Sequence, residues 1–265
     1  MFSRILVGYL DNEQGHDALE LGRILAQAGG ADLLVFTAST ENGGGLSELA
    51  RSEGADLVVL GSTHRGSLGR VVPGATVGHL LGEAPCAVAV APPGFGRRND
   101  GDLGWRPLSG DTDDAGMRVI GVGFDGSTAA QGALDLATEL ALKAGAALRV
   151  YAVARKYATP PGADASGHVP GIPSEAEVLR EQLHEAVACL PTEVRALPVF
   201  MRGAAAFELT RAIELGVDLL VLGSRPGGPM RRALHASVSS AVLLEARCPV
   251  LISPGRVSAP QAVGV

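Results

Sequence analysis

The stretch from Arg118 to Val153 reads RVIGVGFDGSTAAQGALDLATELALKAGAALRVYAV, and its pattern decides the fold. A short apolar run at 118–124 is followed by a helix-like segment at 128–144 and by a second apolar run at 147–153. Short runs rich in Val and Leu that alternate with helices are typical of parallel sheets whose two faces are both covered. The stretch therefore predicts a β-α-β unit.

A similar stretch, RILVGYLDNEQGHDALELGRILAQAGGADLLVFTA, occurs near the start of the chain, where Tyr9 corresponds to Phe124 at a shift of 115 residues. Two further pairs lie 162 residues apart: ADLVVLGSTHRG from Ala55 with VDLLVLGSRPGG from Val217, and EAPCAVAVAP from Glu83 with EARCPVLISP from Glu245. Repeats of this kind indicate two related domains. The difference between the two shifts means that the second copy holds 47 residues that the first lacks.

The periodicity predicts an α/β protein with two doubly wound, mainly parallel-sheet domains, the first lacking one helix–strand unit. The expected strands are 4–9, 33–38, 56–60 and 86–90 in the first copy, and 118–124, 147–153, 194–201, 218–222 and 249–253 in the second. The expected helices of the second copy are 128–144, 174–189, 204–215 and 237–246, and the first copy has a helix at 46–54.

The chain divides into four predicted segments. A truncated domain covers residues 1–93, a complete domain covers 118–256, and a short tail covers 257–265. Residues 94–117 between the domains are rich in Gly, Asp and Pro, a composition typical of a linker.

Composition excludes several classes of protein. The chain has 265 residues, 46% of them hydrophobic, and a formal net charge of -6, which argues against nucleic-acid or membrane-surface partners. No apolar stretch approaches the roughly 18 residues of a membrane helix, and the N-terminus has no signal-peptide pattern. Three widely spaced cysteines lack metal-ligand spacing. We therefore expect a cytoplasmic protein with reduced cysteines and no metal site of its own.

Several motifs carry a resemblance to a known family. FDGS at 124–127 ends the first strand of the second copy, and Gly-Ser pairs come directly after the strands at 56–60 and 218–222. With the closing strands of APCAVAVAP and RCPVLISP, each copy resembles a universal stress protein domain, and the whole chain resembles a tandem member. The resemblance implies the adenine nucleotide alpha hydrolase-like fold, a role in stress response, and pairing of the two last strands in an internal pseudo-dimer. A homodimer of whole chains and an unknown protein partner remain open.

Nucleotide-binding members of that family carry a loop of the form Gly, two residues, Gly, nine residues, then Gly with Ser or Thr. The loop wraps the phosphates of ATP, and an Asp at the end of the first strand contacts the nucleoside. In the first copy His64 replaces the second glycine, the loop closes in Gly74-Ala75, and Leu10 replaces the Asp. The resemblance therefore implies a degenerate first pocket.

The second copy keeps more of the pattern. It retains Asp125 and Gly223, although Pro226 replaces the second glycine and Ala236 precedes the closing Ser. Proline lacks an amide hydrogen, so one phosphate contact is lost. ATP or another adenine nucleotide is the expected ligand, with Mg²⁺ only beside a triphosphate. The candidate binding residues are Asp125, Gly126, Ser127, Val153, Gly223, Ser224, Arg225, Gly227, Gly228, Ser237 and Val238.

These features leave three functional hypotheses. The first is a non-enzymatic regulatory protein that binds an adenine nucleotide in its second domain. The second is a nucleotide-independent scaffold in which both pockets have decayed and Asp125 merely caps the next helix. The third is an enzyme such as an ATP pyrophosphatase or nucleotidyl transferase. The sequence disfavours the third, because it contains no SGGxDS, HxGH or Gx4GK[ST] motif and no recognisable catalytic residues.

Overall fold

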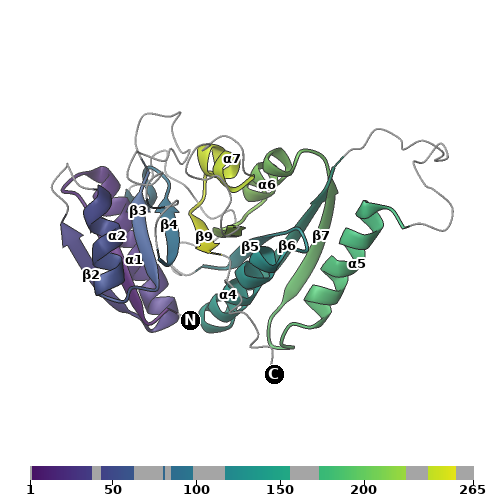
Figure 1. Ribbon diagram of the computed structural model, residues 1–265, viewed down its shortest axis with the longest axis horizontal. Coiled ribbons are helices and arrows are strands. Elements are labelled where there is room, and N and C mark those ends of the chain that lie inside the picture. Colours follow the sequence, from purple (N-terminus) through teal and green to yellow (C-terminus); the bar gives the residue numbers. More distant parts are fainter. Residues whose placement is uncertain are drawn as a thin grey trace, which may run out of the picture.

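The computed structural model describes residues 2–37, 43–62, 80, 85–97, 117–155, 173–224 and 238–254. Within these residues the strands form one sheet in the order β2-β1-β3-β4-β9-β8-β5-β6-β7, with β2 and β7 at its edges (Figure 1). The strands are β1 (Arg4–Tyr9), β2 (Asp32–Thr37), β3 (Leu57–Gly61), β4 (Ala87–Ala91), β5 (Val119–Phe124), β6 (Ala147–Ala154), β7 (Ala196–Arg202), β8 (Leu219–Ser224) and β9 (Val250–Pro254).

The helices alternate with these strands along the chain. They are α1 (Glu13–Gly29), α2 (Gly43–Ser52), α4 (Thr128–Ala144), α5 (Glu175–Ala188), α6 (Ala205–Glu214) and α7 (Val238–Glu245), with a 3-10 turn, η1, at Phe95–Arg97. Every expected strand and helix in this part of the chain is present, with bounds shifted by at most three residues. The α/β fold with a mainly parallel sheet is therefore confirmed.

One strand pair differs in direction from all the others. β4 and β9, the last strands of the two repeats, pair antiparallel with Ala89 opposite Leu251, whereas the other paired strands are parallel. This pairing joins the sheets of the two repeats into one. Across the same junction the Lys143 ammonium of α4 donates to the Gly29 carbonyl oxygen of α1 at 2.7 Å.

Helices cover both faces of the sheet because the central strands bury alternate residues on each side. In β3, Leu57 and Val59 join the core beneath α1, α4 and α5, while Val58 and Leu60 join the core beneath α2, α6 and α7. All four side chains are less than 7% exposed, as expected for a strand covered on both faces.

The two repeats agree in individual contacts. The Asp56 carboxylate accepts hydrogen bonds from the backbone amides of Ser3 and Arg4, and Asp218 does the same for Arg118 and Val119. These bonds fix the start of β1 and of β5. The first helix of each repeat also ends at a left-handed glycine, Gly30 with φ 64° and Gly145 with φ 65°, a conformation that glycine adopts without steric cost.

The repeats differ in the elements after their second strand. In the first repeat α2 leads from β2 to β3, whereas α5, β7 and α6 all intervene between β6 and β8. The first residues of the predicted linker pack against α1, since Phe95 is 2% exposed and the buried Asp17 carboxylate accepts from the amides of Gly94 and Gly96.

Candidate functional site

A cavity of about 110 Å³ lies at the carboxyl ends of β5, β6 and β8, beside the first turns of α4, α6 and α7. Ligands of open parallel sheets bind at this end of the strands. The residues around it are Gly123, Phe124, Asp125, Ser127, Ala129, Ala130, Tyr151, Val153, Ala205, Leu209, Leu222, Gly223, Val238 and Ser239.

Asp125 and Ser127 form the turn that connects β5 to α4. The Asp125 Oδ1 atom accepts from the Ser127 amide at 3.1 Å and from the Ser127 hydroxyl at 2.5 Å. Ser127 is the N-cap of α4, and its Oγ accepts from the Ala130 amide at 3.2 Å. The Asp125 carboxylate therefore braces the helix cap and stands at the rim of the cavity.

The glycine between them is required by the backbone. Gly126 has φ 76°, a left-handed conformation that other residues adopt only with strain. A Cβ atom at this position would also lie 2.4 Å from the Gln182 Oε1 atom of α5. Gly126 thus shapes the turn, and the structure does not place it among the residues around the cavity.

Gly223 is present for a packing reason. A Cβ atom on Gly223 would lie 2.3 Å from the Ala129 carbonyl oxygen, because the end of β8 passes directly against the first turn of α4. The corresponding glycine of the first repeat, Gly61, would place a Cβ atom 2.0 Å from the Gln14 carbonyl oxygen. Both glycines are therefore needed for strand-to-helix packing, whether or not a phosphate binds beside them.

The inner wall of the cavity is apolar. Tyr151 and Val153 face it from β6, two residues apart and therefore on the same side of the strand, and Leu209 faces it from α6. Tyr151 is 3% exposed, and burial raises the pKa of its phenol above the ordinary value. The hydroxyl of Ser239, in the first turn of α7, donates a hydrogen bond to the Gly223 carbonyl oxygen at 3.3 Å.

Five of the predicted binding residues meet at this cavity: Asp125, Ser127, Val153, Gly223 and Val238. Ser224 is the last residue of β8 but does not border the cavity. The predictions for Arg225, Gly227, Gly228 and Ser237, like those for Pro226 and the rest of that loop, fall outside the described residues. Sequence reasoning missed Tyr151 as a site residue, although its alternation with Val153 was a usable signal, and it also missed Ser239.

The matching turn of the first repeat is built differently. Leu10 occupies the position of Asp125, and its carbonyl oxygen accepts from the Asn12 amide at 2.8 Å. The Asn12 side chain caps α1 by accepting from the Gly15 amide at 2.9 Å, as Ser127 caps α4. The helix cap is thus preserved, but no carboxylate stands at the position of Asp125.

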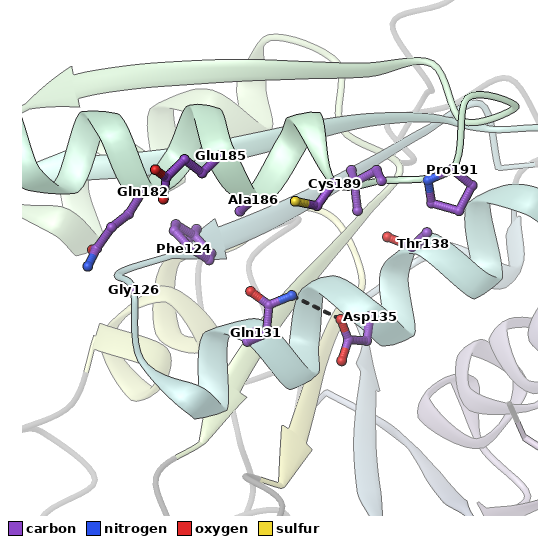
Figure 2. Close-up of a pocket in the computed structure, with 11 residues that line it drawn as sticks. Phe124, Gly126, Gln131, Asp135, Thr138, Gln182, Glu185, Ala186, Cys189 and Pro191 are labelled. Carbon is purple, nitrogen blue, oxygen red and sulfur yellow. Dashed lines mark hydrogen bonds between the residues drawn. The ribbon is translucent and has the colours of Figure 1, made fainter.

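A larger groove of about 610 Å³ lies between α4 and α5, on the opposite face of the sheet (Figure 2). Gln131 and Asp135 face it from α4, with the Gln131 amide donating to the Asp135 carboxylate at 3.0 Å. Glu185 and Cys189 border it from the α5 side. Carboxylates on both helices disfavour a phosphate ligand there, so the smaller cavity is the candidate nucleotide site.

Comparison with known proteins identifies the family of this chain. The model of the universal stress protein family matches residues 40–92 and 116–254. The chain belongs to the universal stress protein family. No curated protein matches the sequence of this universal stress protein.

Solved structures resemble this universal stress protein over nearly its full length. A putative universal stress protein from Pseudomonas aeruginosa UCBPP-PA14 has a TM-score of 0.60 and 17% identity, covering 96% of this chain and 93% of its own. A universal stress protein from Archaeoglobus fulgidus DSM 4304 has a TM-score of 0.55 and 15% identity, covering 97% and 86%. These likenesses show the fold.

A protein of the same family from Burkholderia pseudomallei is 34% identical over a shorter region. It covers 52% of this chain and 96% of its own, with a TM-score of 0.41.

Two further features concern metals and membranes. No group of three or more His, Cys, Asp or Glu side chains in the described ranges is arranged to hold a metal ion. The helices of those ranges are all too short or too polar to cross a membrane.

Proposed function

We propose that this universal stress protein is a regulatory, non-enzymatic protein that binds an adenine nucleotide in its second repeat. The observation that supports the proposal is the cavity at the carboxyl ends of β5, β6 and β8, which combines an apolar wall with one carboxylate at its rim. Ligand sites commonly have this composition, with a few polar groups that orient the ligand among apolar side chains.

The chemistry of the cavity suits a nucleoside. Tyr151, Val153 and Leu209 offer apolar surface to a purine base. The Asp125 carboxylate can accept hydrogen bonds from ribose hydroxyl groups, and such bonds to a charged acceptor are stronger than neutral ones. The phosphates would then point toward the loop that contains Gly227 and Gly228, as the family resemblance implies. Mg²⁺ would accompany a triphosphate only.

A regulatory role fits the cavity better than catalysis does. Among the described residues around it, Asp125 is the one carboxylate, and it is engaged with Ser127 in the helix cap. A general base needs a free position within reach of an attacking water. We therefore propose that nucleotide occupancy acts through conformation or partner binding.

One observation favours the second candidate, a nucleotide-independent scaffold. The cavity of about 110 Å³ is smaller than the roughly 300–1,000 Å³ of ordinary ligand pockets. In addition, Gly61 and Gly223 are explained by packing alone. In a scaffold, Asp125 would have only its helix-capping role.

Native mass spectrometry with ATP, ADP and AMP distinguishes the two candidates. We expect one nucleotide per chain, and we expect Asp125→Asn to weaken binding by about tenfold or more, because it removes the charge that ribose hydroxyls would meet. Asn keeps an oxygen that can accept from Ser127, so the cap survives. Asp11→Asn is the matched control in the exposed turn of the first repeat and should leave affinity unchanged.

Each other outcome has a clear meaning. No binding at millimolar nucleotide would support the scaffold. Two nucleotides per chain would show that the first repeat binds despite Leu10. Equal losses in Asp125→Asn and Asp11→Asn would remove the assignment of the site to the second repeat.

A further inference from the structure

The outer edge of β2 has backbone groups that no described strand pairs with. The Asp32 amide donates to the Ser3 carbonyl oxygen at 2.9 Å, so the backbone groups of Asp32 point toward β1. Peptide groups alternate in direction along a strand. Those of Leu33, Val35 and Thr37 therefore point away from β1, toward the edge of the sheet.

In the second repeat, the corresponding edge of β6 is paired with β7. The Leu148 amide, which corresponds to that of Leu33, donates to the Arg195 carbonyl oxygen at 2.9 Å, and β7 then pairs along β6. α5 packs over both strands. As a result Val150 is completely buried, whereas the corresponding Val35 of β2 is 49% exposed.

The opposite edge of the sheet is protected against pairing. The register of β7 on β6 turns the peptide groups of Ala196, Pro198 and Phe200 outward. Pro198 has no amide hydrogen, so a strand added there would find a donor missing. β7 also ends in Arg202, a charged residue of the kind that discourages edge pairing.

β2 is less protected, because its one charged residue, Asp32, lies at its first position. Its sequence, DLLVFT, contains no proline and no lysine or arginine, and it pairs with β1 in unbroken register without a bulge. Leu34 and Phe36 are only partly buried on one face of the strand, and Val35 is exposed on the other. An edge strand with outward backbone groups and exposed apolar side chains is a template for another strand.

We propose that β2 binds a second copy of this chain through antiparallel pairing with β2 of the partner subunit, about a two-fold axis at Val35. The strand suits its own copy. With Val35 opposite Val35 of the partner subunit, Leu34 pairs with Phe36 and Leu33 with Thr37. The first two kinds of pair are entirely apolar, and no like charges face each other.

The backbone supports the same register. The outward peptide groups at Leu33, Val35 and Thr37 would all find partners in an isologous pair. Pairing β2 with β7 of the next copy would instead be heterologous and open-ended, and Pro198 opposes it. The proposal does not depend on nucleotide binding, because β2 lies at the far edge of the sheet from the cavity of the second repeat.

Analytical ultracentrifugation of the full chain tests the proposal at concentrations up to about 100 µM. We expect a dimer, and we expect Val35→Lys to raise its dissociation constant by tenfold or more, because two like charges would meet at the axis. The matched control is Leu197→Lys, which changes the 56% exposed apolar residue of the other edge strand and should leave the dimer intact. A monomeric wild type, a dimer that survives Val35→Lys, or polymers that grow with concentration would overturn the proposal.

Disulfide cross-linking tests the same pairing without placing a charge in the strand. Hydrogen-bonded antiparallel pairs have Cα atoms about 5.5 Å apart, within the range that a disulfide spans. In a Cys189→Ser background, which removes the exposed native thiol, Val35→Cys should oxidise to a covalent dimer on a non-reducing gel. Leu197→Cys should not. Equal cross-linking of both variants, or none in Val35→Cys, would contradict pairing at Val35.

Discussion

Val35 in β2 and Val150 in β6 are the same residue type at corresponding positions of the two repeats, but β2 pairs only with β1 among the described strands, whereas β6 pairs with both β5 and β7. Val150 is completely buried beneath α5 and beside β7, whereas Val35 is 49% exposed. The comparison shows that the burial of this position depends on α5 and β7, which follow β6 in the chain, and not only on the strand in which the valine lies.

A second pair of positions leads to a different lesson. Gly61 and Gly223 meet the same obstacle, a carbonyl oxygen in the first turn of the neighbouring helix. The repeats have diverged at Leu10 and Asp125 but not at these glycines. Packing therefore accounts for both glycines, including Gly61 of the first repeat, where no carboxylate stands at the position of Asp125.

The largest effect is expected from placing the same charge at the two valines. Val150→Lys should lower the free energy of unfolding by about 3–5 kcal/mol, because an unpaired charge would be buried. Val35→Lys should change it by less than about 0.5 kcal/mol, since its ammonium can reach water. Urea unfolding at one low protein concentration measures both. Similar losses would mean that β2 is covered as tightly as β6.

A smaller effect is expected from the two packing glycines. Gly61→Ala and Gly223→Ala should each cost about 1–3 kcal/mol, because the added methyl group would collide with backbone that cannot move aside. Gly132→Ala is the control within α4, where a Cβ atom meets nothing within 4 Å, and it should stabilise by about 0.5–1 kcal/mol.

Denaturant midpoints with far-ultraviolet circular dichroism report these changes. If Gly223→Ala kept full stability and lost only nucleotide binding, the glycine would serve the phosphate rather than the packing.

Much of the fold was predictable from the sequence because repeated apolar runs report strands that are buried on both faces. The expected strand at 118–124 corresponds to β5 at Val119–Phe124, and the unequal shifts of the repeats anticipated that α5 and β7 separate β6 from β8. Periodicity could not show that Val35 would be exposed on β2, at the opposite edge of the sheet. The burial of Val150 depends on α5 and β7, which have no counterpart beside β2 among the described residues, and a local pattern does not record this difference.

The candidate site was predictable where chain connectivity determines position. Asp125 and Ser127 had to lie at the end of β5, and Val153 at the end of β6, because parallel strands bring their carboxyl ends to one edge. Tyr151 and Ser239 were missed because the remaining side chains around the cavity are those that the folded chain brings close to it in space. The hydrogen bonds from Ser127 to Asp125 could not be predicted either, because the sequence suits both a ligand-binding and a helix-capping role for the Asp125 carboxylate.

The smallest effect is expected from Cys86 and Cys248, another corresponding pair. Burial, assisted by the nearby Asp56 carboxylate, raises the pKa of Cys86 from 9.0 to about 11, and complete burial raises the pKa of Cys248 further. The neutral thiol is favoured in the folded state, so the stability from this source is present below pH 9 and is lost as pH rises toward 11.

Alkylation with iodoacetamide, followed by peptide mass spectrometry, tests this order. At pH 9 a thiol of pKa about 11 is only about 1% thiolate, so Cys86 should react slowly, with a rate that rises about tenfold per pH unit. Cys189 is exposed and serves as the internal reference. Cys248 should react only through unfolding, because it is completely buried in the folded chain. If Cys248 were labelled as fast as Cys86 under folding conditions, the core of the second repeat would be no more closed than that of the first, and the contrast between Val35 and Val150 would be confined to the edge of the sheet.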